Sequence, residues 1–453
     1  MQIVKKLLDK YIRGDERGIK AKTNILASFL LKGSSIVIGF LLVRVTLNYL
    51  DQTRYGIWLT LTSLIGWITF FDLGLGNGLR NKLAEALAVK DYELCKIYVS
   101  TTYAIITIIM VLLAIVFFVA NSFIDWSVIL NTDKALASEL SMVAMIVFNL
   151  FFFRLVLQLI GVVLLADQRP AMSSLFNSLG NIFSLIVIFG LTYITKGSLV
   201  SFSLAMSGIP VIILGFVTVY FFKKDYSLFK PSIAYIRFKY GTSLLSLGIK
   251  FFLIQISGLI LYQSSNILIT QFFGPKEVIP YNIAYKYFSL MTMVLSIILI
   301  PFWTAFTDAW TKGDISWIKR SVNKLLKYWL GLSLLGIIFL IGSNKFYSIW
   351  LGNKVTVPFS LSVVTFIYFV TMAFTQIFTM FINGVGKIQL QLILSFVSAV
   401  LFIPLAYFFI KYFHFGIEGI VLASIIGNIE GFVFAPIQYY KIINNKAFGV
   451  WNK

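Results

Sequence analysis

Long apolar runs, separated by short polar connections, occupy the chain from residue 24 to residue 440. A run of about 20 apolar residues matches the thickness of the bilayer core, where a helix satisfies its own backbone hydrogen bonds. The pattern predicts twelve membrane-spanning helices, at 24–48, 56–79, 97–120, 138–164, 174–195, 199–222, 243–273, 280–307, 325–343, 359–382, 388–411 and 416–440. The expected fold class is therefore all-α and integral to a membrane.

The second half of this pattern repeats landmarks of the first. Lys32 and Lys250 lie 218 positions apart, each about a third of the way into its first helix. Further pairs share this offset or a close one: Gln168-Arg169 with Gly386-Lys387, Ala205 with Ala423, and Asp91 with Asp314. Chance similarity between apolar segments is the alternative, but an offset shared by separate landmarks favours duplication.

The repeat divides the chain into two six-helix lobes, at 24–222 and 243–440, joined by a basic, amphipathic cytoplasmic linker at 223–242. Six spans per copy is an even number, so both copies should point the same way, related by a pseudo-two-fold axis along the membrane normal. Residues 1–23 carry apolar residues at helical spacing between Lys and Arg, which predicts either an amphipathic helix on an anionic leaflet or a basic tail. Residues 441–453 form a cytoplasmic tail.

Charge sets the orientation. The 453 residues are 59% hydrophobic and 12% charged, against roughly 25% charged in soluble domains. Of the 38 Lys and Arg residues, 26 fall in one set of alternate segments, 7 in the other and 5 within spans. Because Lys and Arg accumulate in cytoplasmic loops, both termini are predicted to be cytoplasmic. The net charge of +20 then reflects topology, and no nucleic-acid partner is expected.

The sequence offers little for catalysis. A single cysteine, Cys95, and a single histidine, His414, exclude an intramolecular disulfide and argue against a His- or Cys-based metal site. Gly386-Lys387-Ile388 lacks the Ser or Thr that a nucleotide-binding Walker A motif needs. We therefore expect no enzymatic activity, no metal and no cofactor.

Charged groups inside the predicted spans are the functional candidates, because such groups are costly unless they face a cavity or a partner. The basic ones are Lys32, Lys250, Arg154 and Lys286; Arg44 lies near a helix end, where its side chain can reach the interface. The acidic ones are Asp72 and Glu430. Asp72 stands at about the depth of Lys32, so a structural ion pair and a coupling role both stay open. Glu430 is a candidate for ion coupling.

The seventh predicted span is the most polar. Gln255, Tyr262 and Asn266 fall on one face, and Asn282, Tyr285 and Lys286 follow across a short loop. Such stripes often serve hydrogen bonds between membrane helices. Combined with the nearby lysines, this one favours a water-filled cationic vestibule, which suits an anionic substrate such as a phosphate.

One stretch carries a family resemblance. Tyr55-Gly56-Ile57-Trp58, followed by Phe71-Asp72-Leu73-Gly74-Leu75-Gly76-Asn77 and Arg80-Asn81, is similar to the N-terminal region of Wzx-type polysaccharide (O-antigen or capsule repeat-unit) flippases. These belong to the multidrug/oligosaccharidyl-lipid/polysaccharide exporter superfamily, and the twelve-span, two-lobe architecture extends the resemblance over the whole chain.

The resemblance implies a flippase that moves an undecaprenyl-pyrophosphate-linked oligosaccharide from the inner to the outer leaflet by alternating access. Its pyrophosphate would meet the cations of a central cavity, with Lys32, Lys250, Arg154 and Lys286 as candidates in that order. Asp72 falls within the family-like stretch, whereas Glu430 does not. The implied setting is the bacterial cytoplasmic (inner) membrane, with membrane lipids around a monomer and H⁺ or Na⁺ as the coupling ion.

Two other functions stay open. A cation-coupled multidrug antiporter of the same fold should favour acidic groups in its cavity, but this chain has five internal bases against two acids. A membrane polysaccharide polymerase or glycosyltransferase usually needs a sizeable outer loop with basic catalytic residues. The largest outer loop here, 121–137, is mostly apolar or acidic.

Overall fold

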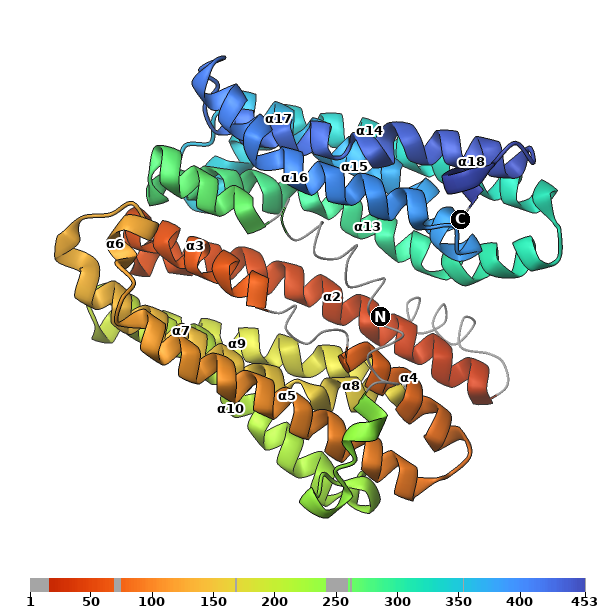
Figure 1. Ribbon diagram of the computed structural model, residues 1–453. Helices are drawn as coiled ribbons and strands as arrows, with labels where there is room; N and C mark the ends of the chain where they lie inside the picture. Colours follow the sequence, from red (N-terminus) through yellow and green to blue (C-terminus); the bar gives the residue numbers. More distant parts are fainter. Residues whose placement is uncertain are drawn as a thin grey trace, which may run out of the picture. The chain divides into compact units, whose positions relative to one another are not determined.

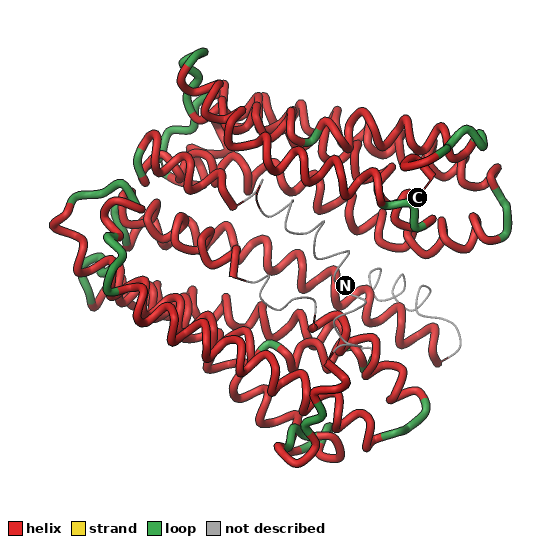
Figure 2. The backbone as a smooth tube through the Cα atoms, in the orientation of Figure 1, coloured by secondary structure: helices red, strands yellow, loops and turns green. Residues whose placement is uncertain are grey.

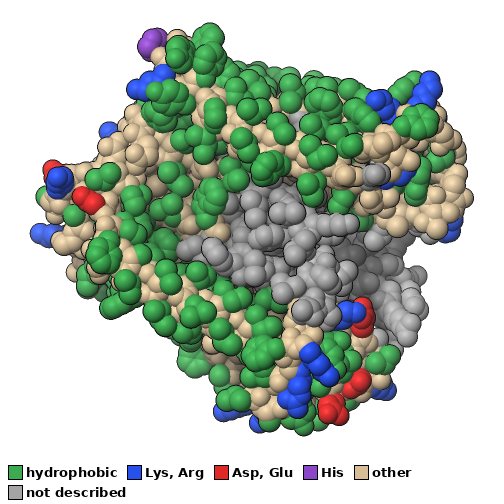
Figure 3. Space-filling view, in the orientation of Figure 1, with side chains coloured by type: hydrophobic (Ala, Val, Ile, Leu, Met, Phe, Trp, Pro, Cys, Tyr) green, Lys and Arg blue, Asp and Glu red, His purple; other side chains and the backbone are tan. Residues whose placement is uncertain are grey.

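The protein is helical throughout the part that the structure describes. The computed structural model describes residues 16–68, 75–167, 169–241, 260, 263–352 and 354–452, with side chains from residue 33 onward and few exceptions later. Figure 2 shows only helices and loops along these ranges, in agreement with the predicted all-α class. Eight of the described helices are long and apolar enough to cross a membrane. On the face drawn in Figure 3, hydrophobic side chains cover the helix flanks and charged ones gather toward helix ends.

The helices pack into two compact units (Figure 1). Unit 1 comprises the chain up to Asp51 together with Ile68–Phe252. Its helices are α2 (Glu16–Tyr49), α4 (Leu75–Ala88), α5 (Tyr92–Asn121), α6 (Trp126–Ile129), α7 (Ala137–Leu157), α8 (Leu159–Ala166), α9 (Pro170–Ile194) and α10 (Leu199–Lys223), with short 3-10 turns η2 (Lys134–Leu136), η3 (Ser227–Phe229), η4 (Ile233–Tyr235) and η5 (Phe238–Tyr240). Helix α2 packs along α9, and α10 packs against both α7 and α9.

Unit 2 comprises Gln52–Trp67 and Leu253–Lys453. It contains α3 (Gln52–Ile68), a helical stretch at 263–273, η6 (Pro275–Glu277), α13 (Val278–Thr311), α14 (Ile315–Leu351), α15 (Phe359–Val385), α16 (Gln389–Lys411), α17 (Ile417–Gly427), a π-helical turn η7 (Glu430–Phe434), α18 (Ala435–Ile443) and η8 (Gly449–Asn452). Its core lies where α13, α14 and α15 meet, around fully buried Phe306 and Phe381.

The second predicted span, 56–79, falls on two helices, α3 up to Ile68 and α4 from Leu75, and 69–74 lies outside the described residues. Each other predicted span coincides with described helix. The seventh does so only through its last part, 263–273, because 242–259 lies outside the described residues. The fourth span is divided between α7 and α8, and the twelfth runs through α17, η7 and α18. Of the predicted N-terminal segment 1–23, the first 15 residues lie outside the described part, and Glu16 onward continues directly into α2.

Two equivalent turns support the predicted repeat. Asp91 caps α5 by accepting a hydrogen bond from the Leu94 N–H at 2.9 Å, and Asp314 caps α14 by accepting one from the Trp317 N–H at 2.9 Å. The residue before each cap has a positive φ, 58° at Lys90 and 71° at Gly313. A side-chain cap satisfies one of the free N–H groups that begin every helix. The third and ninth predicted spans therefore begin with the same capping arrangement, as the predicted repeat requires.

Helix α3 belongs to unit 2, although it lies in the first half of the chain. Two of its glycines explain how closely it packs there. A Cβ placed on Gly56 would fall well inside 3.0 Å of the backbone carbonyl of Pro275, and one on Gly66 would overlap the Gln263 side chain. The contiguous division into lobes at 24–222 and 243–440 stays a prediction. The compact units differ from it by placing α3 in unit 2 and by beginning the rest of that unit at Leu253.

Candidate functional site

The described residues include only some of the predicted basic site residues. Arg154 on α7 and Lys286 on α13 are both partly buried. Lys32 lies in α2, but its side chain is outside the described part, as are Lys250, Gln255, Tyr262 and Asp72. Their assignment to a cavity therefore stays a prediction, and so does the pairing of Lys32 with Asp72.

Polar side chains in unit 2 form a hydrogen-bonded ladder between α3, the helix at 263–273 and α13. Asn282 donates to the Asn266 side-chain oxygen at 2.8 Å, and Asn266 in turn donates to the Ser63 hydroxyl at 2.6 Å. The hydroxyls of Thr60 and Thr270 lie 2.6 Å apart. Asn266 is only 8% exposed and uses both ends of its amide, which is the arrangement of residues that hold membrane helices together.

Lys286 lies one helical turn beyond this ladder. It follows Asn282 by four positions on α13, and residues at that spacing share a helix face. The preceding residue, Tyr285, packs edge-on against Phe369 of α15, with ring centroids 4.9 Å apart. The ladder and the aromatic contacts hold this part of α13 in place, and with it the backbone that carries the Lys286 side chain. A lysine so placed can attract a phosphate through charge and hydrogen bonds.

The backbone of Glu430 begins the π-helical turn η7. Turns of this kind inside α-helices are rare and are frequent at functional sites. The turn packs tightly on α15: a Cβ on Gly431 would overlap Thr375, and Asn428 donates to the Thr375 hydroxyl at 3.5 Å. The Glu430 side chain lies outside the described part, so its coupling role stays a prediction.

A small pocket lies beside this turn, between α15, α16 and α18. Its lining is mixed, with apolar side chains beside Thr379, Gln391 and Gln438. The Gln391 side-chain oxygen is buried without a hydrogen-bond partner among the described atoms. Because an unpaired buried carbonyl is costly, a bound water would satisfy it.

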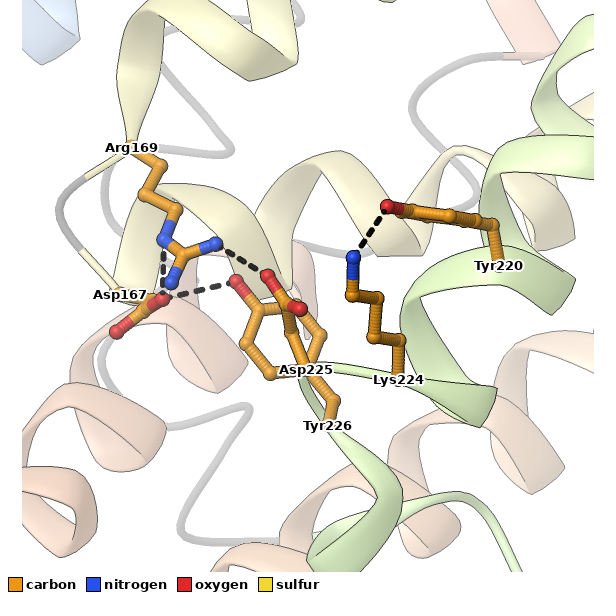
Figure 4. A network of polar contacts seen from close by, with 6 residues as sticks. All are labelled: Asp167, Arg169, Tyr220, Lys224, Asp225 and Tyr226. Atoms are coloured by element: carbon orange, nitrogen blue, oxygen red, sulfur yellow. Dashed lines mark hydrogen bonds and ion pairs between the residues drawn. The ribbon is translucent and has the colours of Figure 1, made fainter.

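An ion-pair cluster that the sequence did not reveal as such joins the ends of α8, α9 and α10 (Figure 4). The Arg169 guanidinium contacts the Asp167 carboxylate at 2.8 Å and the Asp225 carboxylate at 2.6 Å. Tyr226 donates its hydroxyl to Asp167 at 2.9 Å, while Lys224 donates to the Tyr220 hydroxyl at 3.1 Å. The hydrogen bond to Asp225 raises the pKa of Arg169 above its ordinary value, and burial raises that of the Tyr226 phenol.

Unit 2 holds the matching turn in a similar way. Lys387 occupies the position predicted to correspond to Arg169, and its ammonium donates to the Asn452 side chain and lies 4.8 Å from the centre of the Trp310 ring. Gln438 donates to the Lys387 carbonyl at 2.9 Å and to the Trp451 carbonyl at 3.1 Å. Arg169, between the fourth and fifth predicted spans, is therefore held by the chain that follows the sixth span. Lys387, between the tenth and eleventh, is held by the chain that follows the twelfth. Both contacts stiffen that end of the unit.

The long apolar helices and the two compact helical units define the class: a multi-pass, all-α membrane protein. In the ranges that the structure describes, no group of His, Cys, Asp and Glu could hold a metal ion. The chain belongs to the polysaccharide biosynthesis protein family, whose profile matches residues 21–304.

Relatives and solved structures agree with this family. The chain is 21% identical over 432 residues to a Salmonella typhi protein assigned as an O-antigen transporter, covering 93% of this chain and 95% of that one. It is 23% identical over 386 residues to a Yersinia pseudotuberculosis protein assigned to O-antigen export, covering 82% and 85%. In fold, it is similar to a multidrug resistance MATE family transporter of the MOP superfamily in an inward-facing conformation, with a TM-score of 0.75 at 15% identity over 92% of this chain and 96% of the other.

These comparisons confirm the resemblance to polysaccharide exporters and the all-α membrane fold. The relatives are named as transport and export proteins, in agreement with the prediction that the chain is not an enzyme. The fold match shows architecture alone, because drug transporters share it.

Proposed function

We propose that the protein is a flippase for a polyprenyl-pyrophosphate-linked oligosaccharide, working in the bacterial cytoplasmic membrane with both termini inside. The observation that carries this proposal is the match to O-antigen transport and export proteins over 93% and 82% of the chain. Family membership in polysaccharide biosynthesis agrees with it. Alternating access between the leaflets is supported by the similarity to a transporter solved in an inward-facing conformation.

The proposed contact with the substrate is electrostatic. Lys286 and Arg154 are each partly buried, and each is proposed to contact the pyrophosphate during transport, as are Lys32 and Lys250. Charge at membrane depth is retained mainly for function or for pairing. A pyrophosphate needs several positive partners, which these four side chains would provide. Gln255, Tyr262 and Asn266 are proposed as neutral contacts, with Asn266 acting through the ladder that orients α13.

The test is complementation of a strain that lacks this protein, with surface polysaccharide as the readout. Lys286→Gln and Arg154→Gln should each lower the polymer at least tenfold, an effect that corresponds to about 1.4 kcal/mol of lost binding. Lys286→Arg keeps the charge and should retain most export. Lys319→Gln, at an exposed position on α14, is the matched control and should behave as wild type.

Protein amount in the membrane is measured for each variant, so that loss of folding is not mistaken for loss of transport. If all four single variants made wild-type amounts of surface polysaccharide, the cationic site would be ruled out. These variants are Lys286→Gln, Arg154→Gln, Lys32→Gln and Lys250→Gln.

A cation-coupled multidrug antiporter is the second candidate, favoured by the fold match to a MATE transporter. It predicts that deleting the gene raises drug sensitivity and leaves surface polysaccharide intact. Asp72 and Glu430 would then be the residues whose neutralisation abolishes activity. The flippase proposal predicts the opposite pair of phenotypes, so one deletion strain separates the two functions.

A further inference from the structure

The connection between the two halves of the chain is folded onto unit 1. Tyr226 and Phe229 are each only 3% exposed, and their rings lie 5.2 Å apart. The backbone N–H of Ser232 donates to the Ser100 hydroxyl at 3.0 Å, and that of Arg237 donates to the Thr101 hydroxyl at 3.0 Å. A segment predicted from its sequence as a joint is thus fixed along the first turns of α5.

Further contacts hold the middle of this segment. The Lys96 ammonium lies 4.0 Å from the centre of the Tyr235 ring, a distance typical of a cation–π interaction. Tyr240 packs edge-on against Tyr98 with ring centroids 5.6 Å apart. The tyrosines therefore face α5, and the residues between them are directed elsewhere.

The residues between them present large apolar side chains. Leu228 is 64% exposed, Ile233 88% and Phe238 59%. Exposed basic residues alternate with them: Lys230, Arg237 and Lys239. The one nearby acid on the connection, Asp225, is paired with Arg169. We call the three exposed apolar and three exposed basic side chains together the linker face: Leu228, Lys230, Ile233, Arg237, Phe238 and Lys239.

We propose that the linker face is a docking surface for the anionic phospholipid headgroups of the adjoining leaflet. The segment begins where α10 ends and lies along the start of α5, and both helices are apolar spans. Side chains at those helix ends lie at the level of the headgroups. Apolar groups that enter the headgroup–acyl boundary, with basic groups beside them, are the pattern of segments bound to anionic bilayers.

Charge complementarity favours lipid over a protein partner. Three exposed basic residues stand beside three exposed apolar ones, and the one carboxylate of the connection itself, Asp225, is paired with Arg169. Each basic residue adds roughly a fivefold preference for an anionic surface. The inference stands independently of what the protein transports.

The full-length chain, carrying Ile233→Cys labelled with an environment-sensitive dye, tests this proposal in vesicles. Native Cys95 is fully buried, and the unsubstituted chain, treated with the dye in the same way, gives the background. The vesicles contain phosphatidylcholine alone or mixed with phosphatidylglycerol, and no polyprenyl lipid. We expect blue-shifted emission and several-fold weaker iodide quenching in the anionic vesicles.

Combining Lys230→Gln, Arg237→Gln and Lys239→Gln should abolish the difference between the two lipids. The control removes three exposed charges from α14 instead, through Lys319→Gln, Arg320→Gln and Lys324→Gln, and should leave the difference intact. High salt should weaken it, as screening does for exposed charges. A label that is equally quenched in both lipids, or a triple linker variant that behaves like its parent, overturns the proposal and leaves the face to a soluble partner.

Discussion

Replacing Gly56 by Ala should destabilise unit 2 through one close contact. The built Cβ falls well inside 3.0 Å of both the carbonyl oxygen and the carbonyl carbon of Pro275, and 3.2 Å from the Lys276 nitrogen. These are backbone atoms, so no side-chain rotation relieves the overlap and α3 must separate from the chain at 274–277. Overpacking of this kind costs about 1–3 kcal/mol, and a fixed backbone places Gly56→Ala near the upper end.

The contacts around Gly56 enlarge the expected effect. Its neighbours Ile57 and Trp58 are buried, and Thr60 donates to the Gly56 carbonyl at 3.0 Å while its hydroxyl meets that of Thr270. A shift of α3 would strain this part of the ladder that supports Lys286. We therefore expect Gly56→Ala to lower both stability and export.

The assay is the apparent midpoint of thermal unfolding of the purified protein in detergent, followed by size-exclusion of the remaining folded fraction. Gly342→Ala on α14 is the matched control, because in the described part of the chain no atom beyond its own helix turn lies within 4 Å of an alanine Cβ at this position. Alanine is favoured over glycine in a helix by up to about 1 kcal/mol, so this control should be neutral or stabilising. Gly66→Ala should fall between them, because the Gln263 side chain can move. Equal midpoints for Gly56→Ala and Gly342→Ala would refute the close packing of α3.

Three further outcomes follow from the structure. Arg169→Ala should lower the free energy of unfolding by about 1 kcal/mol, because it breaks two ion pairs in which the arginine side chain is 39% exposed. The loss should be smaller in high salt, and thermal unfolding at two salt concentrations measures it. Hydrogen bonds from the Trp317 N–H and, to a smaller extent, the Ser316 hydroxyl lower the pKa of Asp314 below its ordinary 3.8. The ionised carboxylate therefore stabilises the fold above pH 3.8, and this stabilisation is lost as the pH falls through the lowered pKa. Asp314→Asn should flatten this part of a curve of unfolding free energy against pH. Cys95 is 0% exposed, so a maleimide should label the native protein far more slowly than the unfolded one, and fast native labelling would contradict its packing.

The apolar runs predicted the helices well because spanning a bilayer leaves the backbone little choice of structure. Offsets in the sequence also predicted the equivalence of Asp91 and Asp314, which cap their helices in the same way. Both features depend on residues close together in the chain, where pattern and structure are directly linked.

Partners across long sequence distances could not be predicted in this way. The placement of α3 depends on Gly56 and Pro275, which are far apart in sequence, and glycine alone does not show what it will face. Arg169 served only as a landmark of the repeat, because its partner Asp225 follows 56 residues later. Asn266 was predicted from its stripe as part of a vestibule lining, and the structure adds that both ends of its amide bond other side chains.

The most direct test of the proposed function measures which leaflet holds the lipid-linked oligosaccharide. Purified protein is reconstituted with the labelled substrate in sealed vesicles, and a membrane-impermeant glycosidase reports the fraction of oligosaccharide exposed outside over time. We expect wild-type protein and Lys286→Arg to make the inner pool accessible, and Lys286→Gln to do so at least tenfold more slowly. If accessibility in wild-type vesicles stays at the level of protein-free vesicles, or if Lys286→Gln matches the wild type, the account of a cation-guided flippase is wrong.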